Sequence, residues 1–239
     1  MAKKKRAISP LYVHDKPKST VSEKFRGIRS NIMFSSAEKE IQSLLITSEK
    51  PLSGKSTISA NIAVTYAQAG YKTLIIDGDM RKPTQHYIFD LPNNSGLSNL
   101  IVNKATYTES IKETKVENLA ILTAGPTPPN PSELIASTQF DEIYNELLSD
   151  YDFIVVDTPP VNTVTDAQVY AQTIQNCALV IDVEKNNKNE VKKAKDLINK
   201  AGGKLLGAIL NKTAIDKSSS YYYYYGDEWK WLIYTIIYW

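Results

Sequence analysis

The sequence contains a single cysteine, Cys177, among 239 residues. One cysteine cannot form an intramolecular disulfide, which excludes a disulfide-stapled secreted domain and is typical of a reducing compartment. Because Cys177 precedes the apolar run Ala178-Leu179-Val180-Ile181, we interpret it as a core residue and not as a nucleophile.

The sequence also lacks an excess of charge of one sign. Its 28 basic and 26 acidic residues give a net charge of only +2. A dedicated nucleic-acid-binding domain carries a strongly basic surface. We therefore expect no nucleic-acid partner.

Long hydrophobic runs are absent as well. No stretch approaches the roughly 20 apolar residues that span a bilayer, and the N-terminus lacks the apolar segment of a secretory signal. We therefore expect a cytoplasmic protein. For two terminal segments, contact with a membrane or with a partner protein stays an alternative. The basic run Lys3–Arg6 fits either contact with anionic lipid or a solvated arm, and the aromatic-rich end Trp229–Trp239 fits a membrane interface or a partner groove.

What the sequence does contain is a regular alternation of short apolar runs with helical patterns, over a length that suits one sizeable domain. The expected strands are Ser43–Thr47, Thr73–Asp77, Leu119–Thr123, Phe153–Asp157, Ala178–Val183 and Leu205–Leu210. The expected helices are Ser22 to about Ser35, Lys55–Ala69, a short helix from Asn130, Gln139–Leu148, Thr165–Ile174 and Lys188–Ala201. This alternation predicts an α/β fold, a doubly wound and mostly parallel sheet with helices on both faces.

A phosphate-binding loop is indicated where the first predicted strand leads through a turn into Gly54-Lys55-Ser56-Thr57. A strand, a turn and a helix start in that order aim backbone amides at an anion, with Lys55 able to reach terminal phosphates and Ser56 able to ligate Mg²⁺. The general pattern places glycine six residues before the lysine, whereas this sequence has Glu49 there. An ordinary capped helix start is the alternative interpretation.

Two further predicted strands end in acidic residues. One runs into Asp77-Gly78-Asp79-Met80-Arg81 and the other into Asp157-Thr158-Pro159-Pro160. Ligands of parallel sheets bind at the carboxyl ends of the strands, and such aspartates hold the magnesium of phosphoryl-transfer enzymes. A single aspartate there would be explained as a cap. Two acidic ends together with Gly-Lys-Ser-Thr indicate a nucleotide site.

Near the C-terminus stand five consecutive tyrosines: Tyr221, Tyr222, Tyr223, Tyr224 and Tyr225. Successive side chains point in different directions, so some of these phenols are expected to meet solvent. Phosphorylation would add about two negative charges to each one and turn an adhesive segment into a repulsive one. The alternative is an adhesive low-complexity tail without modification.

Together these motifs resemble those of the bacterial tyrosine kinases that regulate capsule and exopolysaccharide synthesis, the CapB, CpsD and Wzc type. The resemblance covers Glu23 to Tyr225 and includes Glu23, Arg26 and Arg29, which match the family's Glu-x-x-Arg-x-x-Arg subunit-contact motif. A solvated helix face is the alternative for these three residues. The resemblance implies a P-loop NTPase-like fold and MgATP as phosphoryl donor.

The resemblance also implies site roles. Nucleotide binding is assigned to Ser53, Gly54, Lys55, Ser56, Thr57, Arg81 and Asn211, and the metal to Ser56, Asp77 and Asp157. Catalysis is assigned to Lys55, Asp77 and Asp79. Asp77 is expected to accept the tyrosine proton or to orient a magnesium-bound water, and the five tyrosines are the expected acceptors.

For organisation, we expect a basic flexible arm (1–20), a P-loop kinase domain (21–215) and a tail (216–239) with the tyrosine cluster and an apolar aromatic end. The resemblance implies a homo-oligomeric ring, protein tyrosine substrates and a separate CapA-like membrane activator that recruits the protein to the inner face of the membrane.

One alternative is a ParA- or MinD-like switch ATPase, because Lys50 matches the extra loop lysine of that class. Another is a scaffold that binds a partner through its aromatic end. Leu52, where the family has glycine, is expected to strain the phosphate loop.

Overall fold

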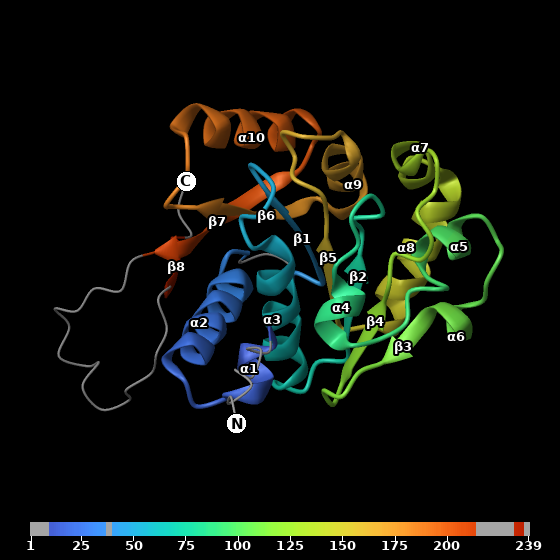
Figure 1. The fold of residues 1–239 in the computed structure, drawn as a ribbon, viewed down its shortest axis with the longest axis horizontal. Helices are drawn as coiled ribbons and strands as arrows, with labels where there is room; N and C mark the ends of the chain where they lie inside the picture. The colour runs from blue at the N-terminus through green and yellow to red at the C-terminus, as the bar shows by residue number, and fades with distance from the viewer. Residues whose placement is uncertain (1–9, 37–39, 214–231, 237–239) are drawn as a thin grey trace, which may run out of the picture.

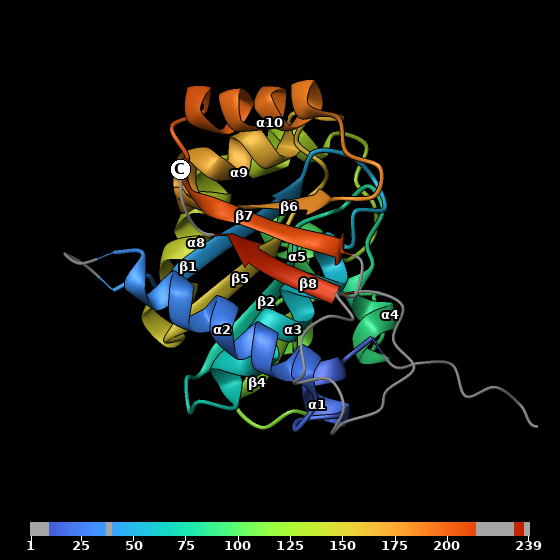
Figure 2. The ribbon, with the colours of Figure 1, turned by 90° about the vertical axis from the view of Figure 1, so that its left-hand side faces the viewer.

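The computed structural model describes residues 10–36, 40–213 and, for the backbone alone, 232–236. In this part of the chain an eight-stranded sheet has the order β3-β4-β2-β5-β1-β6-β7-β8, with helices on both faces (Figures 1 and 2). The strands are β1 Ser43–Ser48, β2 Thr73–Asp77, β3 Ile111–Glu113, β4 Leu119–Leu122, β5 Phe153–Asp157, β6 Asn176–Asp182, β7 Lys204–Thr213 and β8 Leu232–Ile236.

Strands β1, β2, β4, β5, β6 and β7 pair in parallel, whereas the outer strands β3 and β8 pair antiparallel. The predicted fold class is therefore confirmed. Every residue of β1, β2, β4 and β5 is buried, as expected for a sheet covered on both faces. All six predicted strands are present, and β2 and β5 have the predicted bounds.

The helices divide between the two faces of the sheet. Helices α1 Tyr12–Asp15, α2 Thr20–Phe34 and α3 Lys55–Ala67 cover one face, and α8 Thr138–Asp150, α9 Asp166–Ile174 and α10 Lys188–Lys200 cover the other (Figures 1 and 2). Shorter helices are α4 Gln85–Phe89, α5 Leu97–Ile101, α6 Tyr107–Ser110 and α7 Pro131–Ile135. The five long predicted helices and the short one after Asn130 are all present.

Each face of the sheet has its own hydrophobic core. Beneath α2 and α3, the Tyr66 and Phe153 rings stack with centroids 3.6 Å apart and planes 5° apart. Helix α2 buries Phe25, Ile28 and Ile32, whose spacing of three and four residues puts them on one helical face. Cys177 lies in the opposite core and is fully buried, which confirms its interpretation as a core residue.

The predicted flexible arm is wrong for residues 10–20. Leu11 and Val13 are fully buried, and Asn61 of α3 accepts a hydrogen bond from the Val13 amide at 2.9 Å and donates to the Pro10 carbonyl at 2.7 Å. The segment is polar on average, so its composition does not reveal that the short helix α1 and its N-cap bury Val13 and Leu11.

Part of the aromatic end is a strand and not a free extension. Residues 232–236 form β8, which pairs antiparallel with β7 so that Ala208 lies opposite Ile236 (Figure 2). An edge strand presents unpaired amide and carbonyl groups, which an added antiparallel strand satisfies. Among the described helices, none combines the length and the hydrophobicity needed to cross a bilayer.

Candidate active site

The turn between β1 and α3 forms a tight loop around Gly54. Gly54 has φ = +92°, and a Cβ at this position would lie 2.2 Å from Asn211 Nδ2. Only glycine combines this backbone conformation with that close approach. Leu52 in the same loop also has a positive φ, +65°, and its side chain is 89% exposed. The backbone strain expected at Leu52 therefore has a geometric basis.

Lys55, the first residue of α3, lies between two carboxylates at the carboxyl ends of the strands. Its Nζ is 3.1 Å from Asp79 Oδ2 and 3.3 Å from Asp157 Oδ1, and it donates to Ser56 Oγ at 3.2 Å. Burial opposes the charge on Lys55, but the Asp157 and Asp79 carboxylates outweigh it and raise the pKa of the ammonium. The structure thus brings these four predicted residues together.

Asp77 completes the group from β2. It is the Cα partner of Asp157 across the β2–β5 pair and is fully buried. Its Oδ2 accepts hydrogen bonds from the Thr84 and Gln85 amides, both at 2.9 Å, whereas Oδ1 has no partner within the described residues. Burial, followed by the charge of Asp157, raises the pKa of Asp77 to about 8.

Two further side chains contact Asp157 and were missed from the sequence. Gln85 Nε2 donates to Asp157 Oδ2 at 2.8 Å, and Ser59 Oγ donates to Asp157 Oδ1 at 3.4 Å. Ser59 lies four residues after Lys55, so the helical spacing could have placed it on the face that meets the strands. For Gln85, which opens the short helix α4, the sequence carries no comparable signal.

Arg81 is held by another acid that the sequence did not single out. Its Nε and Nη2 donate to Asp166 Oδ2 and Oδ1 at 2.8 and 2.9 Å, a bidentate ion pair, and Nη2 also donates to Ser132 Oγ at 3.1 Å. The Asp166 side chain is fully buried at the start of α9. In this arrangement Arg81 joins the loop after β2 to α7 and α9, and its assignment to nucleotide binding stays a prediction.

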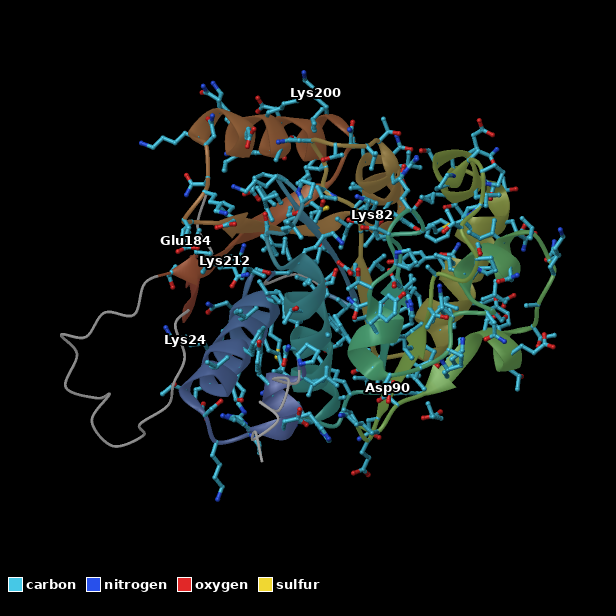
Figure 3. The ribbon with its side chains drawn as sticks, in the orientation of Figure 1. Lys24, Lys82, Asp90, Glu184, Lys200 and Lys212 are labelled. Carbon is cyan, nitrogen blue, oxygen red and sulfur yellow. The ribbon has the colours of Figure 1, made fainter. Side chains whose placement is uncertain are left out.

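The end of β7 supports the phosphate loop from the other side. Asn211 Nδ2 donates to the Ser53 carbonyl at 2.7 Å, and Lys212 Nζ donates to the Leu52 carbonyl and to Asp182 Oδ2, both at 2.8 Å. Figure 3 shows Lys212 at this end of β7. Asn211 therefore supports the predicted nucleotide loop. Thr57, also predicted to bind the nucleotide, lies in the first turn of α3, and its carbonyl accepts a hydrogen bond from Asn61 Nδ2 at 2.8 Å.

Among the described residues, no group of three or more His, Cys, Asp or Glu side chains could hold a metal by itself. Magnesium in nucleotide enzymes instead uses one or two carboxylates together with phosphate oxygens. Asp77 and Asp157 supply such carboxylates, the Ser56 hydroxyl lies 3.2 Å from Lys55 Nζ, and Asp77 Oδ1 is a buried acceptor without a donor among the described groups. These donors fit a magnesium ion shared with a nucleotide.

The predicted subunit-contact residues on α2 have intramolecular partners. Arg26 forms an ion pair with Glu23 and donates to the Pro17 carbonyl, whereas Arg29 donates to the Thr65 carbonyl of α3. Arg29 is therefore partly buried against α3 and does not continue an open charged stripe. The tyrosine cluster, residues 221–225, lies outside the described residues.

Comparisons with known proteins show to which family the chain belongs. The AAA domain family model matches residues 41–200. The chain is 81% identical to CapB of Staphylococcus aureus, a protein assigned as a tyrosine-protein kinase, over 95% of this chain and all of CapB. It resembles the crystal structure of the chimeric protein CapA2B2, with a TM-score of 0.83 and 61% identity over 85% of this chain and 90% of the chimera. It also resembles the kinase domain of the Escherichia coli tyrosine kinase ETK, with a TM-score of 0.83 and 31% identity over 95% of this chain and 89% of that domain. The chain belongs to the bacterial tyrosine-protein kinase family, whose P-loop domain uses ATP.

Proposed function

We propose that this kinase transfers the γ-phosphoryl group of MgATP to the C-terminal tyrosines of a neighbouring subunit and thereby regulates capsular polysaccharide synthesis. The observation that carries the proposal is the convergence of Lys55, Asp79 and Asp157 within 3.3 Å contacts at the carboxyl ends of the strands, beside the buried Asp77. Neither a capped helix start nor a solvated ion pair requires this arrangement.

In the proposed mechanism, the amides around Gly54 bind the phosphates, and Lys55 turns from its carboxylate partners toward the β and γ oxygens. Ser56, Asp77 and Asp157 would hold magnesium, which when bound neutralises charge that develops on the phosphate oxygens. Most of the acceleration comes from positioning and charge neutralisation, since phosphoryl transfer asks for little covalent chemistry from the protein.

The acceptor phenol needs a base, because its unperturbed pKa of about 10 leaves it neutral at pH 7. As the phenol oxygen bonds to the γ-phosphorus, the bond from this phosphorus to the β–γ bridging oxygen breaks and ADP leaves. The phenol proton passes to a carboxylate. We assign it to Asp77, whose buried carboxylate lies beside Asp157 and has Oδ1 unpartnered within the described residues. Asp79 supports the acceptor and the metal geometry.

The proposed partners follow from the family. CapA2B2 joins two proteins in one chain, as its name states. By analogy, we propose a separate CapA-like membrane activator that recruits this kinase to the inner face of the membrane. We also propose a ring of subunits, in which Glu23, Arg26 and Arg29 contribute to the contact and each tail reaches the next active site. Phosphorylated tails would repel one another and loosen such a ring.

The test is incubation of the full chain with γ-³²P-labelled ATP and magnesium, with and without a peptide from the cytoplasmic end of a candidate activator. The expected result is label on Tyr221–Tyr225, located by mass spectrometry, and no label in Lys55→Met. A variant with all five tyrosines changed to phenylalanine controls for other acceptors. Release of free phosphate from an unlabelled protein would instead support the switch ATPase, and tail labelling that survives Lys55→Met would overturn the kinase site assigned here.

A further inference from the structure

We infer that Gln85 is a positioning residue that fixes the Asp157 carboxylate in the geometry required for magnesium-dependent nucleotide binding. The inference rests on the proposed nucleotide site and adds a residue to which the sequence motifs assign no role. Gln85 is fully buried and opens α4, the short helix that follows the Asp77–Arg81 loop.

The contacts of Gln85 join three separate segments. Its Nε2 donates to Asp157 Oδ2 at the end of β5, at 2.8 Å, and to the Ser56 carbonyl in the first turn of α3, at 3.0 Å. Its backbone amide donates to Asp77 Oδ2 at the end of β2, at 2.9 Å. One residue thus links both acidic strand ends with the helix that carries Lys55.

The chemistry of these partners fixes the orientation of the amide group. A carboxylate oxygen and a backbone carbonyl both accept hydrogen bonds, so only the NH₂ end of the Gln85 side chain can serve them, one N–H for each. A glutamate of the same size would face Asp157 with a second carboxylate, and a methionine of similar length would fill the space without a donor. Of these three side chains, only glutamine supplies both N–H donors, and its Oε1 has no partner among the described residues.

Gln85 and Lys55 contact different oxygens of the Asp157 carboxylate. Lys55 Nζ and Ser59 Oγ both contact Oδ1, whereas Gln85 is the donor to Oδ2 within the described part of the chain. Without Gln85, the carboxylate can rotate about its bond to the side chain and lose the direction of its lone pairs. Loss of groups that orient a metal-binding carboxylate costs about 10- to 100-fold in metal affinity or activity.

The test compares ADP binding by the full-length wild type and Gln85→Met, measured by titration calorimetry in Mg²⁺ and in EDTA. Because the phosphate-loop contacts of Gly54, Ser53 and Asn211 are untouched, we expect Mg-free ADP affinity to stay within about threefold of the wild type. We expect ADP affinity in Mg²⁺ to fall about 10- to 100-fold. Gln172→Met, the same change at an exposed residue of α9, is the matched control and is expected to bind like the wild type.

A conservative series separates positioning from packing. Gln85→Glu keeps the shape but repels Asp157, so its Mg-dependent affinity is expected to be at least as low as that of Gln85→Met. Gln85→Asn keeps the amide but is one methylene short of both partners, and it replaces Gln85→Met if circular dichroism shows that the methionine variant is unfolded. If neither variant folds, Gln85 is a folding residue and the inference is overturned.

The remaining outcomes are equally decisive. Unchanged affinity in Mg²⁺, or an equal loss with and without Mg²⁺, would overturn the positioning role while leaving the nucleotide site intact. Failure of the wild type itself to bind ADP would instead count against the proposed function. The two failures are therefore distinguishable in one set of titrations.

Discussion

Asp77 and Asp157 face each other across the neighbouring parallel strands β2 and β5, as Cα partners in register, and both side chains are fully buried. Two acids placed together in the interior repel each other, and each one loses hydration. Lys55 contributes the compensating charge from α3 through its contact with Asp157 at 3.3 Å. The two buried carboxylates of the site therefore depend on the Lys55 ammonium for charge compensation.

Removal of that compensating charge should destabilise the fold. Lys55→Met leaves Asp79 and Asp157 buried without their cation, and breaking a buried ion pair from one side costs about 3–5 kcal/mol. We expect a loss toward the lower end of this range in the free energy of unfolding, measured by urea denaturation at pH 7. Lys193→Met on the exposed face of α10 is the control and should change stability by less than about 0.5 kcal/mol. Equal stabilities would show that the carboxylates do not depend on Lys55.

Leu52→Gly should raise the affinity for ATP. Leu52 has φ = +65° and an 89% exposed side chain, so glycine removes backbone strain without removing a buried contact. We expect ATP to fix the loop in this positive-φ conformation, which glycine adopts at a cost lower by about 1 kcal/mol, and this difference corresponds to roughly a fivefold gain in affinity. Titration calorimetry measures the effect, and Leu52→Ala, which keeps a Cβ at the same φ, should gain much less. Equal or weaker binding by Leu52→Gly would show that the loop already accommodates leucine.

Cys177 should be inert in the folded protein. Its side chain is fully buried, and burial raises the pKa of the thiol to about 12, so the thiol stays protonated and unreactive at pH 8. A colorimetric thiol reagent is expected to give no fast reaction at pH 8 in buffer and one equivalent in 6 M guanidinium chloride. A full equivalent within seconds under native conditions would contradict the burial of this residue.

The stacked pair Tyr66 and Phe153 should make a large contribution to stability. Phe153 is 1% exposed, and replacement of a buried phenylalanine by alanine costs about 3–5 kcal/mol. Phe34 offers the same substitution on the surface, because its side chain is 84% exposed. We expect Phe153→Ala to lower the urea midpoint strongly and Phe34→Ala to leave it nearly unchanged. Similar midpoints for the two variants would be incompatible with a core at Phe153.

Much of the fold could be predicted because its signals are local. The apolar runs at Thr73–Asp77 and Phe153–Asp157 mark buried strands with the bounds that the structure has. Strand β3 was missed because its three residues, Ile111–Glu113, are too few to show a period. The burial of Leu11 and Val13 was missed for a related reason, since a four-residue helix leaves no pattern in a polar segment.

By itself, the sequence determined where the candidate site residues stand: a lysine and a serine at a helix start, and aspartates at strand ends. This was possible because those motifs follow from the local order of strand, turn and helix. Only the tertiary structure decided that Gln85 holds Asp157, that Arg81 pairs with Asp166, and that Asn211 braces Ser53. These pairs are separated by 72, 85 and 158 positions in the sequence. Contacts over such distances depend on how the strands are ordered in the sheet, and no local pattern of residues encodes that order.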